Sequence, residues 1–263
     1  EAPLRLSGAR APVPRPIRAV TLDFWGTLVF EGPRADDRYR ERRLADFEAI
    51  LTRAGFRVTP KDLGRGYEHS ARELTWVWSD NRDIPVVRHV ASILEGAEPG
   101  LSARVAGPIL EALVEAYAAP ALLVPPRADT GARKALDALV GRGLRLAVVS
   151  NTMRTPGRAL RRILEGHGLL SCFHHLTFSD EVGVRKPAAE IFRLTLDALG
   201  VPPGDAAHVG DDARLDVEGA RNAGLRVVQV VAAGGAAGPP EPDFVIQGLE
   251  ALPEAIAALE RHP

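Results

Sequence analysis

The chain has 263 residues, of which 46% are hydrophobic and 25% are charged, and these globular proportions exclude a disordered or fibrous protein. Its 33 basic and 34 acidic residues give a formal charge of −1, so no excess of positive charge favours nucleic acid or an anionic membrane as a partner. Cys172 is the single cysteine, which excludes an internal disulfide and a cysteine-rich zinc site and suits a reducing, cytoplasmic compartment. No apolar run reaches the ~18 to 20 residues that span a bilayer. At this length we expect one large domain, or a core with an insert, as a monomer or homodimer.

The N-terminal segment is rich in arginine and proline and lacks the apolar stretch of a secretory signal. We expect residues 1–16 to form a flexible leader. Residues 17–24 (IRAVTLDF) follow as a nearly continuous apolar run, which is typical of a strand buried on both faces of a parallel sheet. Asp23 lies near the end of this run, so we expect a carboxylate at the carboxyl end of the first strand.

A long helical segment without a convincing strand comes next. Apolar residues recur at helical spacing in four stretches, at residues 34–54, 60–79, 84–96 and 101–119. A helical segment of this length is longer than the single connection that usually joins two parallel strands. We therefore expect residues 31–122 to form an inserted helical domain, a cap over the strand ends, and residues 17–30 and 123–263 to form the core domain.

The aromatic side chains of this cap are its most distinctive candidates for contact with a ligand. Trp76 and Trp78 are two residues apart, so they do not share one face of a helix. We expect one of them to pack internally and the other to be exposed or to lie over the site. The charged run at residues 40–43 is expected to face solvent, with one arginine directed towards the cleft.

The second half of the chain alternates between strand and helix. Four further strands are predicted at residues 144–149, 206–209, 225–231 and 243–246. Helical patterns are predicted at residues 130–142, 156–166, 188–199, 213–223 and 249–261. This alternation predicts an α/β fold with a doubly wound parallel sheet and helices on both faces. Ligands of such folds bind at the carboxyl ends of the strands.

Polar residues stand at three of those strand ends. They are Asp23 after the first strand, Ser150 and Asn151 after the strand at 144–149, and Asp211 and Asp212 after the strand at 206–209. Lys186 lies in an intervening loop, where Pro187 restrains the backbone. Each residue alone also has a structural explanation, as a turn former, a helix cap or a surface lysine. Their order and their common place at strand ends favour a functional site.

This ordered set resembles the four motifs of the haloacid dehalogenase superfamily of aspartate-nucleophile hydrolases. The matching elements are strand-Asp-x-x-Gly-Thr-Leu, a helical cap insert, strand-Ser-Asn, Lys-Pro, and Val-Gly-Asp-x-x-x-x-Asp followed by Ala-x-x-Ala-Gly. The resemblance covers nearly the whole chain. It implies a Rossmann-like core with a helical cap, and a hydrolase that acts on a small phosphorylated substrate.

The resemblance also implies catalytic roles. Asp23 would attack phosphorus and form an aspartyl-phosphate, since a carboxylate needs no deprotonation at neutral pH. Lys186 would neutralise charge on the phosphoryl group and on Asp23. Ser150 would donate a hydrogen bond to a phosphoryl oxygen. Substrate or phosphate contacts are expected at Thr27, Asn151 and Trp25.

A magnesium site is implied beside the nucleophile. Mg²⁺ prefers oxygen ligands, and the family pattern assigns them to Asp23, to the main-chain carbonyl of Trp25 and to Asp211. Asp216 would hold the metal or support its water shell. Asp212 is a further candidate, with a cap at a helix N-terminus as the equal alternative.

Trp25 is the main departure from the family's phosphatase pattern, which has a second aspartate here as general acid. An indole donates one N–H and does not titrate near neutral pH, so it cannot supply the leaving-group proton. Two alternatives to a magnesium-dependent phosphatase therefore stay open: a 2-haloacid dehalogenase-like hydrolase, and a weak or inactive binding protein. Asp83 and His89 in the cap are candidates to replace the acid.

Overall fold

A computed structural model describes residues 16–261 of the chain, and its core is one parallel sheet of six strands. The strand order is β5-β4-β1-β6-β7-β8, and every neighbouring pair is parallel. The strands are β1 (Ala19–Leu22), β4 (Arg145–Ser150), β5 (His175–Phe178), β6 (Ala206–Gly210), β7 (Arg226–Val230) and β8 (Phe244–Ile246). The doubly wound α/β fold predicted from the sequence is confirmed.

The register of the sheet brings the predicted site residues to one edge. Leu22, the last residue of β1, lies opposite Val148 on β4 and Val209 on β6. The chain therefore leaves β1 at Asp23 beside the carboxyl ends of both neighbouring strands. The backbone N–H of Asp23 still donates to the carbonyl of Val209 at 2.8 Å, which fixes the start of the loop.

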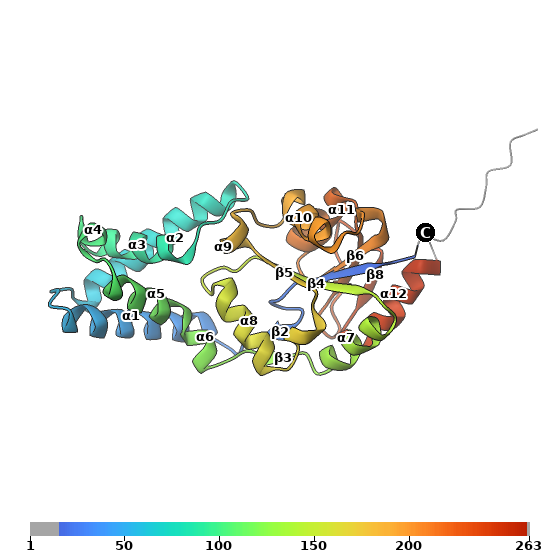
Figure 1. The fold of residues 1–263 in the computed structure, drawn as a ribbon, viewed down its shortest axis with the longest axis horizontal. Coiled ribbons are helices and arrows are strands. Elements are labelled where there is room, and N and C mark those ends of the chain that lie inside the picture. Colours follow the sequence, from blue (N-terminus) through green and yellow to red (C-terminus); the bar gives the residue numbers. More distant parts are fainter. Residues whose placement is uncertain (1–15, 262–263) are drawn as a thin grey trace, which may run out of the picture.

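Helices cover both faces of the sheet (Figure 1). They are α7 (Ala132–Gly141), α8 (Gly157–Gly166), α9 (Ser179–Val182), α10 (Ala189–Leu199), α11 (Gly219–Ala223) and α12 (Leu252–Arg261). Val20 and Leu22 pack with the apolar faces of α7, α8 and α12, whereas Ala19 packs with those of α10 and α11. This alternation follows from the two-residue period of a strand, and it explains why β1 is apolar on both sides.

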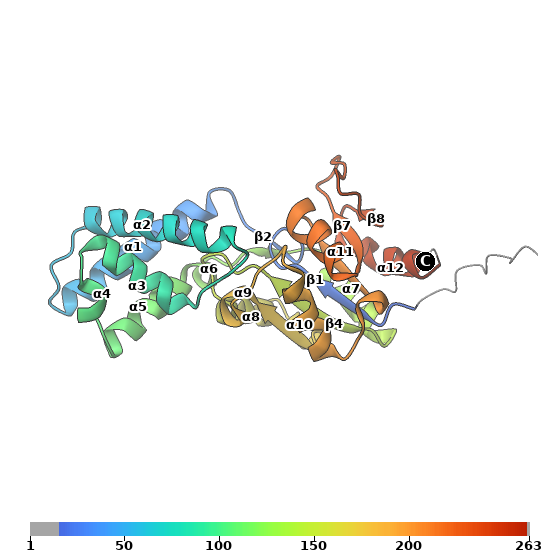
Figure 2. The same cartoon turned by 90° about the horizontal axis from the view of Figure 1, so that it is seen from above.

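The helical segment forms a separate body at one end of the molecule (Figure 2). Its helices are α1 (Ala35–Arg53), α2 (Pro60–Ser79), α3 (Val86–Ala97), α4 (Leu101–Arg104), α5 (Pro108–Ala118) and α6 (Pro120–Leu123). Phe47, Leu63, Ile93 and Tyr117 are buried in a hydrophobic cluster made within this body. The cap therefore has its own core. The domain limits at residues 30/31 and 122/123 stay a prediction.

Several local features differ from the sequence-based expectation. β5 was not predicted, because a four-residue strand that begins with His175 and directly follows His174 gives too short and polar a signal. A two-stranded ribbon of β2 (Val29–Phe30) and β3 (Arg127–Ala128) joins core and cap. The helix expected at residues 213–223 is a π-helical turn, Ala213–Glu218, followed by α11. Short 3-10 turns are formed by residues Leu170–Cys172, Pro203–Asp205 and Leu249–Ala251.

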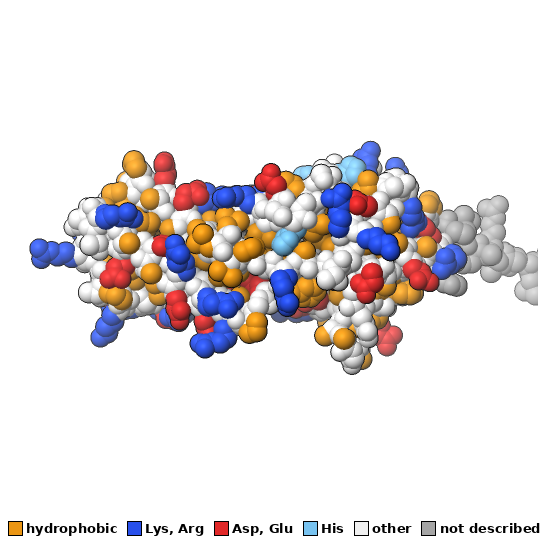
Figure 3. All heavy atoms as spheres, turned by 90° about the horizontal axis from the view of Figure 1, so that it is seen from below, with side chains coloured by type: hydrophobic (Ala, Val, Ile, Leu, Met, Phe, Trp, Pro, Cys, Tyr) orange, Lys and Arg blue, Asp and Glu red, His pale blue; other side chains and the backbone are white. Residues whose placement is uncertain are grey.

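The described surface is mixed in charge. The face drawn in Figure 3 carries basic and acidic side chains side by side, in keeping with the formal charge of −1. Between residues 16 and 261, no helix has both the length and the apolarity needed to cross a membrane. The predicted leader, residues 1–16, lies outside the described residues except for Pro16.

Close packing of α2 on α3 gives a test of the cap. A Cβ on Gly66 would lie 2.1 Å from the carbonyl oxygen of Ile93, which is backbone and cannot move aside cheaply. We expect Gly66→Ala to lower the free energy of unfolding by ~1 to 3 kcal/mol in urea titrations. Gly64→Ala is the matched control on the same helix, where a Cβ meets nothing within 4 Å, and it should stabilise by ~0.5 to 1 kcal/mol. Equal effects of the two substitutions would contradict this packing.

Candidate active site

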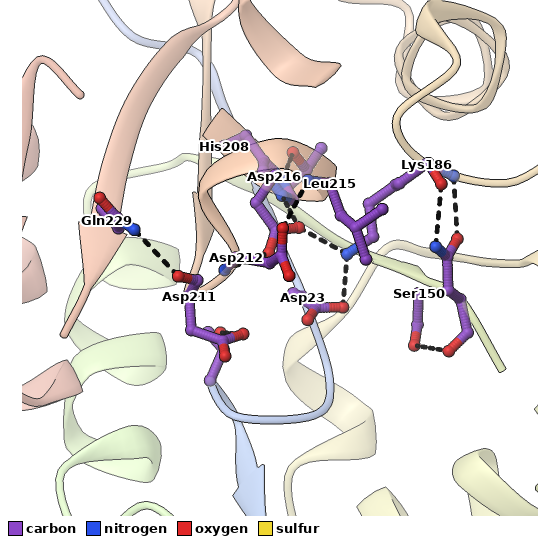
Figure 4. A network of polar contacts seen from close by, with 12 residues as sticks. Asp23, Ser150, Lys186, His208, Asp211, Asp212, Leu215, Asp216 and Gln229 are labelled. Carbon is purple, nitrogen blue, oxygen red and sulfur yellow. Dashed lines mark hydrogen bonds and ion pairs between the residues drawn. The ribbon is translucent and has the colours of Figure 1, made fainter. Parts of the chain in front are cut away.

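The Lys186 ammonium group lies between two carboxylates at the carboxyl edge of the sheet (Figure 4). Its Nζ is 2.6 Å from Oδ1 of Asp23 and 2.6 Å from Oδ1 of Asp216. All three side chains are buried. Asp23 comes from the end of β1, Lys186 from the loop after α9, and Asp216 from the π-helical turn. The fold thus brings together three residues that are far apart in sequence.

This ion triplet sets the protonation of its members. Burial raises the pKa of Asp23 to about 7, in spite of the nearby Lys186, and the charges of Asp216 and Asp211 add to the rise. Burial also favours the neutral form of Asp216, but Lys186 and His208 outweigh it and hold its pKa well below the ordinary value. Burial opposes the charge of Lys186 as well, yet the two carboxylates raise its pKa. Lys186 and Asp216 therefore form a stable ion pair, and Asp23 is the carboxylate whose charge is most easily changed.

Asn151 holds the backbone of Lys186 from the core side. Its Oδ1 accepts a hydrogen bond from the N–H of Lys186 at 2.9 Å, and its Nδ2 donates to the carbonyl of Lys186 at 3.0 Å. Both polar atoms of the side chain are thus engaged, which makes Asn151 a positioning residue in this structure. Ser150 is fully buried at the end of β4, and its hydroxyl donates at 3.4 Å to the carbonyl of Asn151.

Asp211 lies against the loop that follows Asp23. A Cβ on Gly26 would be 2.4 Å from Oδ2 of Asp211, so only glycine allows this carboxylate to approach the loop. The hydroxyl of Thr27 donates to Oδ1 of Asp211 at 3.5 Å. Asp23, Asp211 and Asp216 each offer a carboxylate oxygen, and these oxygens lie within 4.8 Å of one another. An oxygen set of this kind fits a hard divalent cation such as Mg²⁺.

Asp216 and Asp212 contribute differently to that acidic cluster. Oδ1 of Asp216 contacts Lys186 and the ring of His208, and its Oδ2 accepts from the backbone N–H of Asp212. Every oxygen of Asp216 is therefore in use, which suits the supporting role better than direct ligation. The carboxylate of Asp212 accepts from the N–H groups of Arg214 and Leu215, so it caps the π-helical turn.

His208 is a buried part of the site that the sequence analysis missed. Its Nε2 is 3.0 Å from Oδ1 of Asp216, and its Nδ1 is 2.8 Å from the hydroxyl of Thr21 on β1. Burial lowers the pKa of His208, so a neutral ring that donates to Asp216 fits both contacts. The available signal was a histidine within the apolar run AAHV of a predicted buried strand.

Trp25 forms one wall of a cavity of about 430 Å³ between core and cap. The other lining residues come from the cap and from the loop after β4, and they include Glu31, Tyr39, Arg40, Arg43, Tyr67, Trp78 and Arg154. The indole N–H of Trp25 is buried and has no hydrogen-bond partner in the described part of the chain. Trp76 is 81% exposed and Trp78 lines the cavity, so neither belongs to a hydrophobic core and the expectation that one of the pair packs internally is wrong. The cavity places cap residues beside Trp25 in the loop that follows Asp23.

Asp83 and His89, the candidate replacements for the missing acid, do not line this cavity. Oδ1 of Asp83 accepts from the indole N–H of Trp78 at 3.0 Å, and its Oδ2 accepts from the hydroxyl of Ser179 at 2.5 Å. His89 is buried in the cap, where Nδ1 lies 3.0 Å from the hydroxyl of Tyr117. Cys172 is also buried, as expected of a packing residue.

Known proteins have sequences similar to that of this chain. A family model described as haloacid dehalogenase-like hydrolase matches residues 17–224. The human (Homo sapiens) haloacid dehalogenase-like hydrolase domain-containing protein 3 is 34% identical over 223 residues, which are 82% of each chain. Phosphoserine phosphatase from Thermus thermophilus is 45% identical over 89 residues, which are 34% of each chain. The matched stretches span 34% to 46% of the first five curated relatives' own lengths.

A solved structure shows the same overall fold. The 2-haloacid dehalogenase from Pseudomonas syringae pv. Tomato DC3000 superposes with a TM-score of 0.68 at 22% sequence identity. The match covers 92% of this chain and 99% of that chain, so it includes both the sheet and the cap. At this identity the likeness concerns the fold alone.

The raised pKa of Asp23 predicts a pH-dependent effect of removing its charge. Between the ordinary value of 3.8 and about 7, the folded metal-free protein keeps a proton that the unfolded chain releases, so ionisation of Asp23 costs stability as pH rises. We expect Asp23→Asn to gain stability relative to the unmutated protein by on the order of 2 kcal/mol between pH 5 and pH 8. Urea unfolding in EDTA at both pH values measures this difference. A stability difference that is the same at pH 5 and pH 8 would contradict the assignment.

Proposed function

The chain belongs to the haloacid dehalogenase-like hydrolase family, and from this membership we propose that it is a magnesium-dependent phosphatase of a small phosphorylated metabolite. The observation that carries the proposal is the placement of Lys186 Nζ at 2.6 Å from Asp23, with Asp211 beside the same loop. A nucleophilic carboxylate next to a fixed cation is what phosphoryl transfer requires. The name of the Thermus thermophilus relative, phosphoserine phosphatase, supports the same class of reaction.

Asp23 would carry the phosphoryl group between two displacement steps. An oxygen of its carboxylate attacks phosphorus, the bond from phosphorus to the leaving-group oxygen breaks, and an aspartyl-phosphate results. Water then attacks this phosphorus, inorganic phosphate leaves, and the carboxylate of Asp23 is restored. Lys186 would neutralise the transferring oxygens in both steps, with the Ser150 hydroxyl as a further donor.

Asp23, the main-chain carbonyl of Trp25 and Asp211 would hold the magnesium ion, with Asp216 in support. A bound Mg²⁺ supplies charge neutralisation at the phosphoryl oxygens. Asp216 keeps Lys186 charged and in place through its own ion pair at 2.6 Å. His208 and Thr21 in turn support Asp216 from the buried side of β6 and β1. Asn151 holds the Lys186 backbone, and Thr27 holds Asp211.

Because Trp25 cannot donate a proton to the leaving group, the rate of the first step would depend on how acidic the leaving group itself is. Positioned acid catalysis is worth ~10² to 10⁴ in rate, and alkyl phosphates lose most when it is missing. Aryl phosphates and acyl phosphates leave more easily as anions. We therefore place the natural substrate among compounds with a good leaving group, held in the cavity beside Trp25.

The proposal is tested by phosphate release from 4-nitrophenyl phosphate and from acetyl phosphate, with magnesium and with EDTA. We expect turnover that needs magnesium and that falls by at least ~10³-fold in Asp23→Asn, because the amide is no nucleophile. Metal-independent halide release from 2-haloacids, without phosphate release, would instead identify the dehalogenase alternative. Absence of both activities would favour the alternative of a weak or inactive binding protein.

Replacing Trp25 by an acid tests the role of the missing proton donor. We expect Trp25→Asp to raise kcat/KM for an alkyl phosphate by ~10²-fold and that for acetyl phosphate by less than ~10-fold. Trp25→Asn is the matched control, since it opens the same space without a titrating group. Equal gains in the two variants, or equal gains on the two substrates, would show that removing indole bulk explains the effect.

A further inference from the structure

The loop that carries Lys186 is paired with the cap as well as with the core. The segment between α2 and α3 reaches the chain beyond α9 (Figure 1). Two backbone hydrogen bonds join the two segments, one of 3.1 Å from Asp83 N to Gly183 O and one of 3.1 Å from Arg185 N to Asn81 O, and together they make the antiparallel bridge between Arg82 and Val184. We call residues 81–83 with residues 183–185 the clasp. It ends one residue before Lys186.

Asp83 is the centre of the clasp. Its buried carboxylate accepts hydrogen bonds from the indole of Trp78 and from the N–H of Ile84 within the cap. The other oxygen crosses to the core, where it accepts from Ser179 at 2.5 Å and faces Nη1 of Arg185 at 3.7 Å. Asp83 therefore ties the cap both to the start of α9 and to the residue that precedes Lys186.

Asp83 is the carboxylate that compensates the charge of Arg185. Its side chain is buried, and its guanidinium stacks over the Trp78 ring at 4.3 Å from the centroid. Nη1 has no hydrogen-bond partner among the described residues, so Asp83 supplies its compensating charge. An unpaired buried cation is strongly unfavourable. Without Asp83, Arg185 would move towards solvent and take the adjoining peptide of Lys186 with it.

Lys186 is consequently held from two sides. Asn151 grips its backbone from the core, and the clasp fixes the preceding residue from the cap. The Lys186 side chain then runs to Asp23 and Asp216, where both contacts are 2.6 Å. Contacts this short tolerate little displacement of the backbone, because charge neutralisation in phosphoryl transfer depends on position.

We propose that Asp83 is a positioning residue for Lys186 and that it acts through Arg185 and the clasp. The cap must then be in contact with the core at the clasp for Lys186 to be correctly placed for the reaction. This inference rests on the proposed phosphatase function. Separation of the cap at this edge breaks the clasp and frees the Lys186 loop. Asp83 therefore contributes to the reaction without contact with substrate.

A double-mutant cycle with Lys186 tests this coupling. Asp83→Asn keeps the shape but removes the charge, and we expect it to lower kcat for 4-nitrophenyl phosphate by ~10-fold or more with KM changed by less than ~3-fold. In a Lys186→Ala background the same substitution should change kcat by less than ~2-fold. The same cycle on the affinity for orthovanadate in magnesium buffer needs no turnover. An equal loss in both backgrounds would overturn the proposal, because a merely structural role does not depend on Lys186.

Two further variants keep the test decisive. Arg185→Met removes the buried cation and should show the same dependence on Lys186, which covers the case in which Asp83→Asn does not fold. Arg158→Ala is the matched control: Arg158 on α8 contacts Glu115 and the carbonyl of Val114 in the cap, at a seam away from Lys186. It should leave kcat within ~2-fold. A loss like that of Asp83→Asn would show that general loosening of the cap is responsible.

The two proposals fail in different ways. If the unmutated protein releases no phosphate with magnesium, the phosphatase proposal is wrong. If it does release phosphate and the cycle shows no coupling between Asp83 and Lys186, the phosphatase proposal stands and only the role of the clasp is wrong.

Discussion

The buried contact of the Lys186 ammonium with Asp23 and Asp216 is the interaction on which the arrangement of the site depends. Three charges out of water are costly unless each is paired and hydrogen-bonded. The surrounding structure meets this requirement: His208 and the N–H of Asp212 satisfy Asp216, and Asn151 holds the lysine backbone. Of the three groups, Asp23 is the one whose ionised form is least stable. In the proposed reaction this suits a carboxylate that bonds to phosphorus and lies next to Mg²⁺.

The parallel sheet makes this concentration of charge possible. With β1 central and β4 and β6 on either side, chain segments more than a hundred residues apart end at one edge. The cap lies against that edge, and Trp25 forms one wall of the cavity between cap and core. The same cap contacts the Lys186 loop through Asp83, so the part of the protein that lines the cavity also bears on the placement of Lys186.

Much of this arrangement could be predicted from the sequence, for reasons that differ between residues. Asp23, Ser150 and Asp211 follow apolar runs, and a parallel sheet necessarily collects the ends of such runs. The short strand β5 was not predicted because its four residues begin with a histidine and give a weak hydrophobic signal. His208 was overlooked because one polar residue in an apolar strand does not reveal its partner. The clasp had no sequence signal, since its pairing joins residues 81–83 to residues 183–185 in another domain.

The sequence by itself determined the α/β fold, the helical insert and the set of residues that end the strands, because local periodicity and the order of motifs carry that information. It also placed Trp25, whose indole does not titrate near neutral pH, two residues after Asp23. Only the tertiary structure decided which groups contact one another. Asn151 bonds the backbone of Lys186, Asp212 caps the π-helical turn, and Asp83 faces Arg185. The physical reason is that burial and distance fix the energy of a charge, and both arise only when distant segments pack together.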